Sequence, residues 1–128
     1  MRLKKLLLII SLLSWEHSFA STPTSPESTY FLTKIQVSNL TPLALKGSGD
    51  AALALSRFYS NVKLDLDAAL KWAIIGAENG NANCMYTAYA YLEKRESQED
   101  RERANFWLKM AISLGYKPAI DHQMLINH

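Results

Sequence analysis

The stretch DLDAALKWAIIGAENG at residues 65–80 decides the fold, because its spaced residues recur 35 positions later in DRERANFWLKMAISLG at residues 100–115. An acidic residue, an alanine, a tryptophan and a glycine keep the same spacing in both. They are Asp65, Ala69, Trp72 and Gly80 in the first stretch and Asp100, Ala104, Trp107 and Gly115 in the second. Such an echo in a chain of 128 residues predicts a stack of like units instead of one globular core.

Apolar spacing predicts that the unit around Trp72 is a pair of helices. A first helix is expected over residues 50–60, with Ala51, Leu55 and Phe58 on one face and Ser56, Arg57 and Ser60 elsewhere. Its partner is expected to begin at Asp65 as N-cap and to end at Gly80. The sequence therefore predicts an all-α protein.

The same pattern continues toward the C-terminus. A second pair is expected over residues 81–92 and 100–114, with Gly115 as its stop, and residues 118–126 fit the first helix of an unfinished third pair. Small residues on the second helix of each pair let a neighbouring helix approach closely, and the tryptophans fill the space where the backbones diverge. Since glycine inside a helix costs about 0.5–1 kcal/mol relative to alanine, Gly76 indicates a contact without room for a methyl group.

Residues 1–20 have the three parts of a secretory signal peptide. A basic start is followed by an apolar run at residues 6–13 and by the small residues Ser18 and Ala20 flanking Phe19. We expect cleavage after Ala20 and a periplasmic or secreted location. The alternatives are an uncleaved anchor or a buried N-terminal helix, although the run is shorter than the about 20 residues that a membrane span needs.

Residues 21–40 are expected to form a flexible leader and an N-terminal cap. Residues 21–29 are all polar or proline, and residues 30–40 fit neither the helical nor the strand period cleanly, which leaves a short helix or an irregular cap. Thr41 and Pro42 suggest a helix start, and Gly47 a stop. The repeat domain is then expected over residues 41–128.

The charge balance gives no argument for nucleic acid or for stable membrane association. Residues 1–20 hold three of the 14 basic and one of the 12 acidic residues, so 11 of each sign remain after cleavage. The single cysteine, Cys84, cannot form an intramolecular disulfide, although it could pair with another chain. An exported domain of this kind would be held together by packing alone.

At residues 47–120 the sequence resembles the Sel1-like repeat family, a branch of the tetratricopeptide-like α/α solenoids. The two quoted stretches match the family's second helix and its closing glycine, and Gly49-Asp50-Ala51 and Gly80-Asn81-Ala82 match the openings of its first helices. The resemblance implies a short solenoid of about two helix pairs with half-repeat caps. Both connections inside the pairs depart from the family, because they lack its usual glycine-containing turn. A cysteine-rich secreted branch with reported penicillin binding or hydrolysis is not matched.

Catalysis and cofactor binding are not indicated. Cys84 lies among small and apolar residues without a recognisable activating base, so a buried structural role is favoured over a nucleophile. His122 and His128 have no metal-binding spacing, and a frayed terminal segment is their expected setting. The charged run at residues 93–103 reads as a solvated connection and the first turn of a helix, with a binding epitope as the alternative.

Binding to another protein is the function that remains. Tyrosine and arginine are favoured interface anchors, and in solenoids of this kind the first helices line the concave surface. On that basis the candidate contact residues are Arg57, Asn83, Thr87 and Tyr91, while Tyr86 and Tyr89 are expected in the core. A sharper hypothesis is an immunity protein that neutralises a periplasm-acting bacterial toxin. The alternatives are an envelope adaptor or assembly factor and, ranked last, a penicillin-interacting hydrolase.

Overall fold

The computed structural model describes residues 29–127, and these form six α-helices and no strand. The helices are α1 (Lys34–Leu45), α2 (Gly49–Asn61), α3 (Leu66–Glu78), α4 (Ala82–Leu92), α5 (Gln98–Ser113) and α6 (Lys117–Ile126). The fold is therefore all-α, as predicted. The expected signal peptide at residues 1–20 and the leader up to residue 28 lie outside the described part. None of the described helices has the length and apolarity required to span a membrane.

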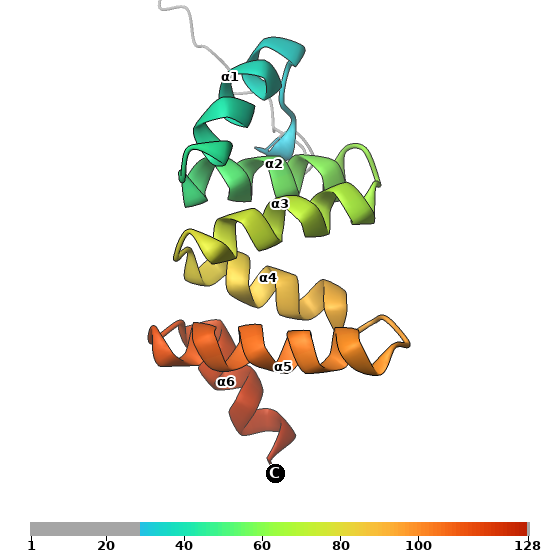
Figure 1. Ribbon diagram of the computed structural model, residues 1–128, viewed down its shortest axis with the longest axis vertical. Coiled ribbons are helices and arrows are strands. Elements are labelled where there is room, and N and C mark those ends of the chain that lie inside the picture. Colours follow the sequence, from blue (N-terminus) through green and yellow to red (C-terminus); the bar gives the residue numbers. More distant parts are fainter. Residues whose placement is uncertain (1–28, 128) are drawn as a thin grey trace, which may run out of the picture.

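The helices follow one another through space in the order of the chain. Figure 1 shows the stack from α1 at one end to α6 at the other, with α2 to α5 lying side by side and α1 and α6 inclined to them. The most extensive packing joins α2 to α3, α3 to α4 and α4 to α5. The connections between α2 and α3 and between α4 and α5 lie at the same edge of the stack (Figure 1).

The first helix differs from its prediction. Thr41 and Pro42 do not start a helix, because α1 begins eight residues earlier, at Lys34 after the N-cap Thr33. Thr33 and Gln36 form a capping box in which each side chain accepts from the other residue's backbone N–H. This reciprocal cap sets the start, and Pro42 is accommodated near the end of the helix. Gly47, at φ 108°, follows the last turn, as expected.

The helix ends around the first quoted stretch are confirmed. The Asp65 carboxylate accepts a 2.9 Å hydrogen bond from the backbone N–H of Ala68, so Asp65 is the N-cap of α3. Gly80 lies just beyond the end of α3 with φ 83°, and Gly115 follows α5 with φ 74°. Both glycines thus occupy the left-handed position that commonly ends a helix.

The acidic residue of the second stretch has a different role from Asp65. The N-cap of α5 is Ser97, whose hydroxyl accepts from the backbone N–H of Asp100 at 3.0 Å. Asp100 is therefore the third residue of α5, and the predicted start of this helix at residue 100 is wrong by two residues. Ser97 becomes the N-cap because its hydroxyl oxygen is a hydrogen-bond acceptor like the Asp100 carboxylate and lies about one turn earlier. Asp100 then lies in the first turn, where its charge interacts favourably with the positive end of the helix.

The core consists of two clusters of small and large apolar residues. One surrounds Trp72 and includes Leu55 and Ala52, and the other extends from α3 to α6 through Cys84, Leu92 and Ala119. Ala69 and Ala104 are both buried, whereas Trp107 is only half-buried against the second cluster. The repeated alanines are thus buried in both stretches, whereas the two tryptophans differ in burial.

Gly76 lies where α3 approaches α4 closely. A Cβ at this position would lie 2.3 Å from Sγ and 2.9 Å from Cβ of Cys84 in α4, and 3.2 Å from Cβ of Ala52. The expectation that Gly76 leaves no room for a methyl group is confirmed.

Ser56, which was expected away from the apolar face of its helix, also packs inside the protein. It is fully buried, and its hydroxyl donates a 2.8 Å hydrogen bond to the backbone carbonyl of Ala69. A polar side chain can face α3 here because this carbonyl satisfies it.

Candidate protein-binding surface

Arg57 projects from the exposed face of α2. Its neighbours in sequence, Ser56 and Phe58, are buried, so Arg57 is the residue of this turn that faces solvent. The guanidinium carbon lies 5.9 Å from the centre of the Tyr30 ring, within the range of a cation–π contact. Arg57 thus lies on the surface beside an aromatic ring, and no side-chain hydrogen bond or ion pair of its guanidinium is found within residues 29–127.

Asn83 and Thr87 form a polar stripe on α4. Both are half-buried, they lie one helical turn apart, and the Thr87 hydroxyl is 3.5 Å from the Asn83 side-chain oxygen. Cys84 and Ala88, which pack into the core, lie about 100° around the helix axis from Asn83 and Thr87. The structure therefore brings these two candidates together on one face, as the helical spacing predicts.

Arg57 belongs to the helix beside this stripe. Burial raises the pKa of the Cys84 thiol to about 12, and the nearby charge of Arg57 partly opposes that rise while the charge of Asp50 adds to it. Cys84 immediately follows Asn83 in α4. Helices α2 and α4 are also in direct contact.

Tyr91 continues the four-residue spacing of Asn83 and Thr87 but lies in a different environment. It lines a hollow of about 280 Å³ together with Leu66, Asp67, Lys94 and Arg95. The Asp67 carboxylate forms an ion pair with Arg95, which ties the start of α3 to the connection after α4. Tyr91 thus faces the edge of the stack that holds the connections, away from the stripe.

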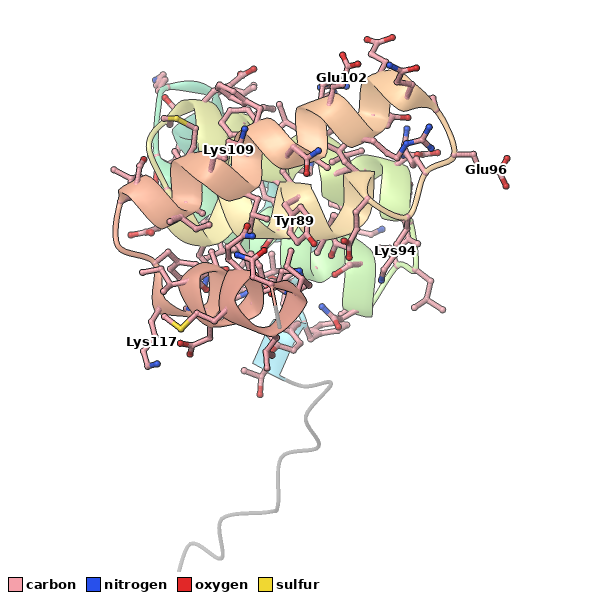
Figure 2. The ribbon with its side chains drawn as sticks, turned by 90° about the horizontal axis from the view of Figure 1, so that it is seen from below. Tyr89, Lys94, Glu96, Glu102, Lys109 and Lys117 are labelled. Atoms are coloured by element: carbon pink, nitrogen blue, oxygen red, sulfur yellow. The ribbon has the colours of Figure 1, made fainter. Side chains whose placement is uncertain are left out.

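The tyrosines expected in the core join a cluster that the sequence did not indicate. Tyr89 is buried and Tyr86 half-buried, and their rings stack with centres 5.7 Å apart. The Tyr89 hydroxyl lies 2.6 Å from His122 Nε2 of α6, and Figure 2 shows Tyr89 in the region between α5 and α6. Burial raises the pKa of the Tyr89 phenol and Glu93 raises it further, so the hydroxyl stays protonated.

The prediction that His122 lies in a frayed terminal segment is therefore wrong. It is half-buried, and its ring lies 5.3 Å from that of Tyr89 and 6.1 Å from that of Tyr86. These contacts fasten α6 to α4. No local pattern in the sequence links Tyr89 to His122, because they are 33 positions apart. His128 lies outside the described residues.

The charged run at residues 93–103 divides as expected between a connection and the first turns of α5. Lys94 and Glu96 project from the connection at one edge of the molecule, while Glu102 and Lys109 project from α5 (Figure 2). Within residues 29–127, no group of three or more histidine, cysteine or acidic side chains is placed to hold a metal ion.

No protein-family model, curated protein or solved structure shows significant similarity to this chain.

Proposed function

We propose that this protein is a short α/α solenoid of the Sel1-like type and that it works by binding another protein. The proposal of the repeat type is supported by the equivalent places of the paired residues. Ala69 and Ala104 are both buried, and Gly80 and Gly115 both end their helices in the left-handed conformation. The differing roles of Asp65 and Asp100 mark the limit of this equivalence.

The observation that carries protein binding is the arrangement of Arg57, Asn83 and Thr87. Arg57 is exposed on α2, Asn83 and Thr87 are half-buried on α4, and Arg57 takes part in no ion pair among the described residues. Arginine beside polar, half-buried side chains is the kind of surface that serves as an interface anchor. Tyr91 adds an aromatic contact at the edge of the same helix.

Binding is favoured over catalysis by Cys84. The thiol is fully buried, and its pKa of about 12 keeps it protonated at neutral pH, whereas a nucleophilic cysteine requires the thiolate. A penicillin-interacting hydrolase with this thiol as its nucleophile is therefore the least favoured alternative.

We further propose that the protein is exported through residues 1–20 and acts as an immunity protein against a periplasm-acting toxin, with an envelope adaptor as the alternative. The full chain would be expressed together with the product of the adjacent gene, and growth, co-purification and the N-terminal residue of the periplasmic form would be measured. Rescue of growth, co-purification and an N-terminus at Ser21 are expected. Growth arrest that the full chain does not relieve would refute the immunity role.

The surface itself is tested by substitution. The double variant Arg57→Ala/Thr87→Ala should weaken co-purification at least about tenfold, as loss of an interface anchor does, whereas Lys109→Ala, on the exposed face of α5, should leave it unchanged. Equal binding by the two variants would show that the partner uses another surface.

A further inference from the structure

A groove lies between the start of α1 and the end of α2, away from the stripe on α4. It has a volume of about 350 Å³, and its walls include the aromatic side chains of Phe31, Phe58 and Tyr59. Lys34 and Lys63 also line it. This volume is at the lower end of the range for pockets that bind ligands in proteins.

Part of the apolar wall is exposed to solvent. Phe31 is 60 % exposed, whereas Phe58, which also lines the groove, is buried. Ile35, in the first turn of α1 but outside the groove lining, is 74 % exposed. Large exposed apolar side chains that adjoin a groove are typical of surfaces that another molecule covers.

The charged side chains that line the groove are both basic, and among the described residues no carboxylate lines it. The nearest acidic residue in sequence is Asp65, two residues after Lys63, and its backbone N–H donates to the carbonyl of Tyr59. The three ion pairs among residues 29–127 involve neither Lys34 nor Lys63, and the Lys63 ammonium instead lies 5.6 Å from the centre of the Phe58 ring.

We propose that this groove binds an acidic segment of a partner protein, which inserts an apolar side chain against Phe31 and Phe58 and places carboxylates beside Lys34 and Lys63. The inference rests on the proposed protein-binding function and adds the chemistry of the partner. Two separate lysines on an apolar wall fit a peptide with several carboxylates better than a fatty acid, which has one. One peptide would then both cover the exposed Phe31 ring and form ion pairs with Lys34 and Lys63.

The inference is tested with a displayed library of random twelve-residue peptides selected on the purified full chain. The groove variant Lys34→Glu/Lys63→Glu and the control variant Lys46→Glu/Lys109→Glu, which reverses two exposed lysines outside the groove, are treated in parallel. The groove lysines are exposed, and glutamate is favoured in the first turn of a helix such as α1, so folding is expected to persist and is verified by circular dichroism.

Peptides that combine acidic and apolar residues should be enriched on the wild type and on the control variant. Their affinity should fall at least about tenfold on the groove variant and should weaken with added salt, since the attraction is electrostatic. Amide chemical shifts at residues 31–37 and 58–63 should move when the best peptide is added.

Three results would overturn the inference: no enrichment, enriched peptides without acidic residues, or equal binding by the two variants. Decanoate that shifts the groove amides while peptides do not would assign the groove to a lipid anion instead. Co-purification that depends on Arg57 and Thr87 but not on the groove lysines would leave the proposed function standing without this groove.

Discussion

A methyl group added at Gly76 should destabilise the protein, although alanine is the better helix former. The new Cβ would lie 2.3 Å from the sulfur of Cys84, closer than such atoms approach in folded proteins, and Cys84 is fully buried. Overpacking of this kind costs about 1–3 kcal/mol, and the gain in helix propensity returns about 0.5–1 kcal/mol. Gly76→Ala should therefore lower the free energy of unfolding by about 1–2 kcal/mol.

The second stretch indicates how the clash can be relieved. Thirty-five positions after Gly76 and Cys84 stand Ala111 and Ala119, both fully buried in the same cluster. A methyl group on the second helix of the pair is thus matched by a smaller side chain on the helix that follows. The double variant Gly76→Ala/Cys84→Ala reproduces this combination between α3 and α4, and it should recover at least about half of the loss because it removes the sulfur.

Urea unfolding followed by circular dichroism at 222 nm measures these differences for the two single variants and the double variant. For a folded region of this size, each kcal/mol corresponds to a change of about 4–8 °C in Tm. The reasoning fails if Gly76→Ala is as stable as the wild type, or if the effects of the two substitutions simply add.

Three further outcomes are expected. Trp72→Ala should lower the free energy of unfolding by about 3–5 kcal/mol, and Trp107→Ala by clearly less, because Trp72 is 9 % exposed and Trp107 is half-buried. Equal losses for the two variants in urea unfolding would contradict this. Burial raises the pKa of the Cys84 thiol from 9.0 to about 12, so its contribution to the free energy of unfolding is complete below pH 9 and is lost between pH 9 and 12. Between pH 8 and 11 the free energy of unfolding of the wild type should therefore fall by on the order of 2 kcal/mol more than that of Cys84→Ala. His122→Ala should speed amide hydrogen exchange in α6 and leave α2 and α3 unchanged, whereas unaltered exchange in α6 would show that the contact with Tyr89 does not hold this helix.

Local signals were sufficient for most of the helix boundaries. Asp65 and Gly80 delimit α3 because capping depends on a side chain and a backbone angle within a few residues of the helix end. The same locality explains the two errors. Thr33 and Ser97 are also capping residues, and each competes successfully with the predicted start, at Thr41 and Asp100 respectively, by extending the helix toward the N-terminus.

Contacts between distant residues were less accessible from the sequence. Gly76 could be interpreted because glycine inside a helix has a cost that needs a reason, and Cys84 is that reason. Ser56 carries no such signal, since serine is usually exposed and only the carbonyl of Ala69 makes its burial favourable. Likewise, nothing near His122 in the sequence points to Tyr89.

The candidate surface was predicted in part for the same reason. Helical spacing places Asn83 and Thr87 on one face, and the structure has them there. The direction of Tyr91 depends on where the start of α3 and the connection after α4 lie, and the groove between α1 and α2 depends on a helix whose start was mispredicted. Spacing within one helix therefore predicts a face, and packing between helices decides what that face meets.

The order of the helices in Figure 1 has a consequence for how the chain folds. Since the most extensive contacts join helices that follow one another in sequence, the loops that must close during folding are short, and folding in the microsecond to millisecond range is expected. If the chain is exported as proposed, helices α1 to α3 cross the membrane before α5 and α6 and can assemble first. The order in which the helices emerge thus favours growth of the stack from its N-terminal end.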